Sequence, residues 1–286
     1  MKEPRRKRRA GTTAQPSGRK SSVLSPINEH AAAACALPCI FIVTALGGPG
    51  REREDNLTNE TNSAAVDALD GFAALGISGP LLKATHAMGY TSPKPIQEQS
   101  IPAQLEGRDI LGIAQTGSGK TVAFSLPILA KIVGIGTKRV ARTCRALILA
   151  PTRELAVQIE EEIRAMSKGL HISTALVLGG VSRFSQVKKM APGVDILIAT
   201  PGRLTDLVRE GEISLTETRW LVLDEADRML DMGFIHDVRR IAKATHKERQ
   251  TALFSATMPA EIEKLAGDLL KSPARVEVAP QSTTAG

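Results

Sequence analysis

The chain has 286 residues and is 42% hydrophobic, which is enough for a sizeable core in one or two domains. Aromatic residues make up only 3%, which argues against a base-stacking surface with many rings. The net charge is +7, but residues 1–20 hold eight Lys or Arg and one acid, so the rest of the chain is balanced. A nucleic-acid site in the main body must therefore depend on local groups. Cys35, Cys39 and Cys144 lack disulfide-framework or metal-ligand spacing, which favours a reducing, cytoplasmic setting.

Residues 1–68 differ in composition from the rest, and we expect them to form a disordered or poorly structured extension. The basic run Arg5–Arg9 could contact phosphate backbones or could simply be a solvated tail. The apolar run Ala31–Leu46 is shorter than the roughly 20 residues that a membrane-spanning helix needs, and Pro38 interrupts it. It weakly resembles the apolar part of a signal peptide, but the thirty residues that precede it are too many for a normal signal peptide. We therefore expect no contact with a membrane.

Organised sequence begins at Phe72. Ser78 as a cap, Pro80 in the first turn and Gly89 as a stop predict a helix between them. The two prolines of Gly89–Gln97 predict an extended loop, with a helix over residues 96–105 after it. From the residues alone, Gln97 would be an ordinary surface residue.

The segment Asp109–Thr121 has the pattern of a phosphate-binding loop. An apolar strand at 109–114 leads into Gly117-Ser118-Gly119-Lys120-Thr121, and a helical segment follows. Glycines let backbone N–H groups turn toward a phosphate, and the helix N-terminus adds a partial positive charge. Lys120 could reach the terminal phosphates and the Thr121 hydroxyl could bind Mg²⁺. Ala114 stands where the usual pattern begins with Gly.

Short apolar strands then alternate with helices, which predicts an α/β fold with a mainly parallel sheet covered on both faces. In such a sheet, ligands bind beyond the carboxyl ends of the strands. Polar or glycine-rich clusters follow most of these strands, which we expect at residues 146–150, 173–178, 195–200, 220–223 and 251–254. A purely structural domain has no reason for that placement.

Asp224 and Glu225 follow one of these strands. Asp224 could hold Mg²⁺ opposite Thr121, and Glu225 could orient and deprotonate a water molecule. The alternative is a helix N-cap with an acidic first turn. Together with the phosphate loop, the pair favours transfer of a phosphoryl group to water.

Two further groups of residues carry weaker signals. Ser255 and Thr257 could hydrogen-bond Asp227, or could serve only as turn residues. Gly179-Gly180, Arg153 and Arg203 are typical of phosphodiester contacts, although Arg153 could instead pair with Glu154 or Glu160. Nothing indicates base-specific reading.

Six motifs in this order resemble the DEAD-box ATP-dependent RNA helicases, and the body looks closest to the bacterial RhlE-type subgroup. The resemblance covers about residues 70–286, and in this family the loop commonly begins with Ala. The motifs are Ala114-Gln115-Thr116-Gly117-Ser118-Gly119-Lys120-Thr121, Pro151-Thr152-Arg153-Glu154-Leu155-Ala156, Gly179-Gly180, Thr200-Pro201-Gly202-Arg203, Asp224-Glu225-Ala226-Asp227 and Ser255-Ala256-Thr257.

The resemblance implies a role for each motif. Gly89–Gln97 looks like the family's Q motif, so Gln97 would read adenine and Phe72 would pack on the base, although Lys94 replaces a frequent Thr. Residues 114–121 would bind ATP, with Lys120, Asp224 and Glu225 catalytic and with Thr121 and Asp224 holding Mg²⁺. Asp227, Ser255 and Thr257 would couple hydrolysis to strand separation. Backbone contacts to RNA would come from Pro151, Thr152, Arg153, Gly179, Gly180, Thr200, Pro201, Gly202 and Arg203.

The resemblance also implies a RecA-like helicase domain at residues 69–278, with residues 279–286 beginning a linker to a second such domain that this chain lacks. Ribosomal or RNA-degradation assemblies are possible partners by the same resemblance. Three functions therefore stand open: half of an RNA-stimulated ATPase and helicase, a nucleotide- and RNA-binding module without turnover of its own, and another type of P-loop ATPase. The Q-motif-like stretch and Asp224–Asp227 disfavour the third.

Overall fold

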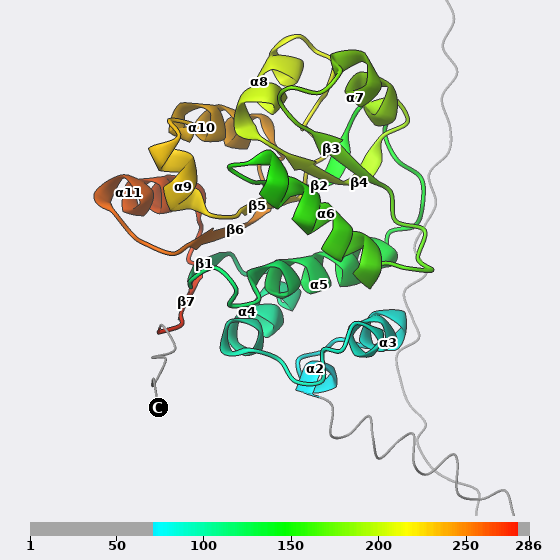
Figure 1. The fold of residues 1–286 in the computed structure, drawn as a ribbon, viewed down its shortest axis with the longest axis vertical. Coiled ribbons are helices and arrows are strands. Elements are labelled where there is room, and N and C mark those ends of the chain that lie inside the picture. The colour runs from blue at the N-terminus through cyan, green and yellow to red at the C-terminus, as the bar shows by residue number, and fades with distance from the viewer. Residues whose placement is uncertain (1–70, 280–286) are drawn as a thin grey trace, which may run out of the picture. The chain divides into compact units, whose positions relative to one another are not determined.

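A computed structural model describes residues 71–279 of the chain, and these form a seven-stranded sheet covered by helices on both faces (Figure 1). The strand order is β3-β4-β2-β5-β6-β1-β7, and every neighbouring pair is parallel. The strands are β1 (Ile110–Ile113), β2 (Cys144–Leu149), β3 (Thr174–Val177), β4 (Val194–Ala199), β5 (Trp220–Leu223), β6 (Gln250–Ser255) and β7 (Ala274–Glu277).

One face of the sheet packs against the helices that come early in the chain. Ile148, Val222 and Phe254 project from the strands into this core, where they meet Phe124 and Ile159. The helices on this face are α2 (Gly71–Ala74), α3 (Gly79–Ala87), α4 (Pro95–Leu105), α5 (Lys120–Val133) and α6 (Arg153–Met166). Ile159, Ile163 and Met166 are buried on the inward face of α6.

The opposite face packs against the later helices. Alternate residues of the same strands, such as Leu147, Leu149 and Leu223, enter this second core. Its helices are α7 (Arg183–Met190), α8 (Pro201–Arg209), α9 (Ala226–Asp231), α10 (Ile235–Ala244) and α11 (Ala260–Leu269). Because the central strands are buried on both sides, most of their residues are apolar, which is why they read as nearly continuous hydrophobic runs.

All seven strands point the same way, so their carboxyl ends meet at one edge of the sheet, called here the carboxyl edge. The predicted parallel sheet with helices on both faces is therefore confirmed. Strand β7 was not predicted, because its sequence Ala-Arg-Val-Glu has a single buried residue, Val276. The extension 1–68, with its runs Arg5–Arg9 and Ala31–Leu46, and residues 280–286 lie outside the described residues. Within residues 71–279, no helix is both long and apolar enough to cross a membrane.

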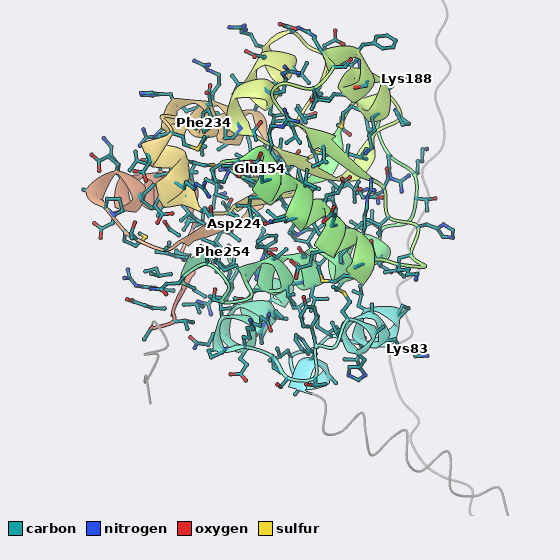
Figure 2. All side chains as sticks on the ribbon, viewed as in Figure 1. Lys83, Glu154, Lys188, Asp224, Phe234 and Phe254 are labelled. Carbon is teal, nitrogen blue, oxygen red and sulfur yellow. The ribbon has the colours of Figure 1, made fainter. Side chains whose placement is uncertain are left out.

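Gly112, in the strand before the phosphate-binding loop, offers a test of how the core is packed. A Cβ added at Gly112 would lie 2.4 Å from Cδ1 of Phe254, whose fully buried ring packs on Phe124 with 5.6 Å between centroids. Gly112→Ala should therefore lower the free energy of unfolding by about 1–3 kcal/mol, because extra atoms in a filled core force neighbours out of place. Denaturant titration followed by circular dichroism measures this (Phe254 is labelled in Figure 2).

Gly267 is the matched control for this substitution. It lies in α11, and an added Cβ would meet nothing within 4 Å. Gly267→Ala should stabilise the fold by up to about 1 kcal/mol, because alanine loses less backbone entropy in a helix. Equal unfolding midpoints for the two variants would contradict the packing described here.

Candidate nucleotide and nucleic-acid site

The phosphate loop follows β1 and ends in the first turn of α5. Gly117 and Gly119 have φ angles of 83° and 90°, in the left-handed region that glycine adopts without strain. The Oγ of Ser118 is buried without a hydrogen-bond partner, and a cavity of about 360 Å³ lies beside the loop, lined in part by Gln115, Thr116 and Gly117. A buried polar atom left unpaired beside a cavity is what an absent anionic ligand would satisfy. The loop thus fits a phosphate.

Lys120, the first residue of α5, faces Asp224, which directly follows β5. Their side chains are only 6% and 4% exposed, and the distance from Nζ to Oδ1 is 3.8 Å. Nζ also donates to the carbonyl of Ala114 at 3.2 Å. Thr121 is the second residue of α5 and is partly exposed. The structure therefore brings the predicted phosphate-binding lysine to the predicted Mg²⁺-side carboxylate (Asp224 is labelled in Figure 2).

Burial raises the pKa of Asp224 to about 6, because a carboxylate loses its hydration inside the protein. The Lys120 ammonium opposes this shift, and the neighbouring Glu225 carboxylate adds to it. Since the folded-state pKa lies above the ordinary value, the fold is favoured by this group at low pH and loses that contribution as pH rises through about 6. A cation at the carboxylate would reverse the penalty. The buried carboxyl group would therefore be stabilised in its ionised form by a positively charged ligand.

Glu225 occupies a strained backbone position. Its φ is 53°, one of three non-glycine residues with positive φ among residues 71–279, and strain of this kind is concentrated at functional sites. It sits at the N-cap of α9, but its side chain makes no capping bond, so the N-cap interpretation fails for its carboxylate. One oxygen accepts from Thr116 Oγ1 at 3.3 Å, and the other pairs with Arg228 at 3.3 Å. Sequence reasoning gave Arg228 no role.

Asp227 joins the ends of β5 and β6. Its Oδ2 accepts from both the backbone N–H and the hydroxyl of Thr257 at 2.9 Å, and its own N–H donates to Ser255 Oγ at 3.1 Å. Burial works against ionisation of Asp227, but these hydrogen bonds outweigh it and hold the pKa of the carboxyl below its usual value. The predicted hydrogen bonds among Asp227, Ser255 and Thr257 are therefore present. Their coupling role stays a prediction.

The loop before α4 lies against the phosphate loop. Gln97 is buried, accepts from the N–H of Lys94 at 2.8 Å and donates to the carbonyl of Gly119 at 3.1 Å. The ammonium of Lys94 reaches the carbonyl of Gly117 at 3.0 Å. Gln97 is thus not the ordinary surface residue that its local sequence indicates, and Lys94 makes a contact of its own. An amide or ammonium side chain gives no local sign of such a long-range bond.

Phe72 lies in α2 and has an exposed fraction of 0%. Its ring belongs to the core that also contains Ile96 from the start of α4. The next residue back, Gly71, approaches Pro93 so closely that an added Cβ would lie 2.4 Å from the proline ring. Phe72 therefore supports the loop before α4 from beneath. Packing of its ring against a bound base stays a prediction.

The predicted RNA contacts occupy the other half of the carboxyl edge, where β2, β3 and β4 end. Thr152 caps α6 by accepting from Leu155 N at 3.3 Å, and Pro201 begins α8 next to Thr200. A Cβ at Gly180 would lie 2.6 Å from the Arg153 guanidinium, so these two residues adjoin although they follow different strands.

Among the described residues Arg153 forms an ion pair with neither Glu154 nor Glu160, and Glu160 pairs instead with Arg164 and Lys189. Arg153 is left exposed at the carboxyl edge, where phosphate could reach it.

Two side chains fix the loop that contains Gly179 and Gly180. Buried Gln186 of α7 accepts from Leu178 N and donates to Leu178 O, both at 3.0 Å. Arg203 of α8 donates to the carbonyl of Val181 at 3.0 Å. Arg203 therefore links the loops after β3 and β4. The role of Gln186 was not predicted, because a glutamine within a helix gives no local sign of hydrogen bonds to the backbone outside that helix.

The chain belongs to the DEAD/DEAH box helicase family, whose pattern matches residues 94–265. It is 45% identical over 243 residues to DEAD-box ATP-dependent RNA helicase 52A of Oryza sativa subsp. japonica, a match covering 79% of this chain and 40% of the rice protein. Over 213 residues it is 44% identical to ATP-dependent RNA helicase CshA of Limosilactobacillus reuteri, covering 74% and 42% respectively. The chain thus spans about two-fifths of the length of these relatives.

The fold is also similar to solved structures. A crystal structure of a DEAD box protein from the hyperthermophile Methanococcus jannaschii matches with a TM-score of 0.67 and 35% identity, covering 73% of this chain and 56% of that one. These matches confirm the RecA-like helicase fold that the motifs imply.

The Lys94 contact can be tested directly. Lys94→Met keeps the length of the side chain but removes the ammonium that bonds Gly117 O. We expect amide hydrogens of residues 114–121 to exchange about 2- to 10-fold faster, because a hydrogen bond of this kind contributes about 0.5–1.5 kcal/mol. Hydrogen-exchange mass spectrometry of the nucleotide-free chain measures this.

Lys83→Met is the control, because Lys83 is exposed on α3 (labelled in Figure 2). It should leave exchange at residues 114–121 unchanged. If Lys94→Met also leaves it unchanged, the bond to Gly117 does not order the loop.

Proposed function

We propose that this chain is the ATP-binding part of an ATP-dependent RNA helicase, and that it binds Mg²⁺-ATP and the backbone of single-stranded RNA. The observation that carries the proposal is the placement of two sites on one carboxyl edge. The phosphate loop, Asp224 and Asp227 lie at the ends of β1 and β5, and Arg153 and Arg203 lie beyond β2 and β4. The relatives named as ATP-dependent RNA helicases support both ligands.

In the half of the carboxyl edge where β1, β5 and β6 end, called here the nucleotide half, each residue has a distinct role. Lys120 would bind the terminal phosphates, while Gln97 would hydrogen-bond adenine with the amide that now bonds Gly119. Mg²⁺, held by the Thr121 hydroxyl and Asp224, would neutralise phosphate charge. Glu225 would orient the attacking water and accept its proton, with its carboxylate aimed by Thr116 and Arg228.

In the half where β2, β3 and β4 end, called here the RNA half, the groups suit an RNA backbone of any sequence. Arg153 and Arg203 supply cations, and the glycine pair leaves backbone N–H groups accessible. Asp227, bonded to Ser255 and Thr257, would pass changes at the nucleotide to the rest of the protein. A second RecA-like domain would complete the site, and unwinding belongs to that larger protein. We further propose from the family resemblance that the chain is of the RhlE-type subgroup and acts with ribosomal or RNA-degradation assemblies, and from its cysteine usage that it acts in the cytoplasm.

Lys120→Ala tests the nucleotide half. We expect the variant to bind a fluorescent ATP analogue at least about tenfold more weakly in Mg²⁺, because a charge-assisted hydrogen bond contributes about 1.5–3 kcal/mol. The direct measurement is a titration at equilibrium with and without EDTA. Lys83→Ala is the control and should bind like the unaltered chain. Unchanged affinity in Lys120→Ala would show that the loop is not a phosphate site.

Arg203→Ala tests the RNA half. Binding of a single-stranded RNA should weaken for all sequences alike, and the slope of log affinity against log salt should fall by about 1, because one phosphate contact is lost. Arg209→Ala is the matched control, since Arg209 is exposed at the end of the same helix. An unchanged salt slope in Arg203→Ala would remove this residue from the interface.

A further inference from the structure

Phe184 is the most exposed large hydrophobic residue among those described. Its exposed fraction is 78%, and its ring makes no aromatic contact within residues 71–279. It lies in the first turn of α7, four residues after Gly180. Val181, between them, is also exposed. A phenylalanine left in water beside the carboxyl edge costs solvation free energy that burial against a ligand would recover.

The helix that carries Phe184 is held firmly to the neighbouring loops. Gln186 bonds both backbone groups of Leu178, and the carbonyl of Val181 accepts from Gln186 and from Arg203. On the same turn, Arg183 is paired with Glu210 and Glu212, beyond the end of α8. The position of the first turn of α7 relative to Gly180 and Arg203 is therefore set by several hydrogen bonds and ion pairs.

The surroundings of the ring suit a nucleobase. Arg203 donates to the carbonyl of Val181 in the loop before Phe184, and the guanidinium of Arg153 adjoins Gly180 in the same loop. Exposed Lys188 lies one turn further along α7 (labelled in Figure 2). A flat apolar ring next to cations that attract a phosphate backbone is the combination that single-strand binding surfaces use, with the ring stacking on a base.

We propose that Phe184 is a base-stacking contact for single-stranded RNA, at the point where the strand passes Gly180. This inference rests on the RNA binding proposed above, and it adds a contact to a base where all the other contacts are to the backbone. Stacking is tolerant of sequence, because every base has a flat face. The contact would grip RNA without selecting a sequence.

Two variants test the proposal in the whole chain. Phe184→Ala should bind an oligoadenylate ten nucleotides long roughly 5- to 150-fold more weakly, the range for loss of one stacked base. It should bind an abasic oligoribonucleotide of equal length as the unaltered chain does. Phe184→Trp places a fluorophore at the same position, and its emission should fall when oligoadenylate is added but not when the abasic strand is added.

Controls separate this proposal from RNA binding as such. Ile135→Ala removes another exposed apolar side chain, 53% exposed on the loop after α5, and should not alter binding. If Arg203→Ala weakens binding of oligoadenylate while Phe184→Ala does not, the stacking contact is wrong and the RNA site stands. If the unaltered chain binds neither strand, both proposals fail. Equal loss of both strands in Phe184→Ala would also overturn stacking.

Discussion

A buried lysine facing a buried aspartate is the interaction on which the nucleotide site depends. Lys120 and Asp224 lie 3.8 Å apart and are almost fully enclosed, so each charge relies on the other for compensation. Removing one partner of a buried pair typically costs about 3–5 kcal/mol, because the remaining charge is uncompensated. The pairing is nonetheless incomplete, since burial still raises the pKa of Asp224 to about 6. A polyanion with a divalent cation satisfies both groups better than they satisfy each other.

The order of the strands divides the carboxyl edge into two halves, one for each proposed ligand. Strands β1, β6 and β5 lie side by side and carry the phosphate loop, Ser255 and Asp224. Strands β2, β4 and β3 form the other half and carry Arg153, Arg203 and the glycine pair. Strands β5 and β2 are neighbours, so the boundary between the halves runs next to Asp224 and Glu225.

Much of this architecture could be predicted from the sequence, because central strands buried on both faces are apolar at most positions. That is why β2, β4 and β5 were found, and why β7, with one buried residue, was missed. The order of the strands was not predictable, since it is set by which strands pair with each other in three dimensions. The contacts of Gln97 and Lys94 with the phosphate loop were also not predictable from local sequence, because they join residues more than twenty positions apart.

Local patterns also left interpretations open that only three-dimensional contacts could decide. Ser255 and Thr257 could have been only turn residues, but both hydrogen-bond Asp227, which follows the neighbouring strand. Arg153 could have paired with Glu160, but Arg164 lies one helical turn from that carboxylate and takes it. The parallel sheet brings Asp227 to Thr257, while the spacing within α6 gives Glu160 to Arg164 and leaves the RNA role of Arg153 a prediction.

The most direct test of the account is a crystal structure of this chain with a non-hydrolysable ATP analogue and Mn²⁺ in place of Mg²⁺. Anomalous scattering would locate the metal without reference to the expected site. The account predicts an anomalous peak between the Thr121 hydroxyl and Asp224, with the terminal phosphates at Lys120 and adenine at Gln97. A metal bound elsewhere, or a nucleotide whose phosphates lie away from residues 117–121, would contradict it.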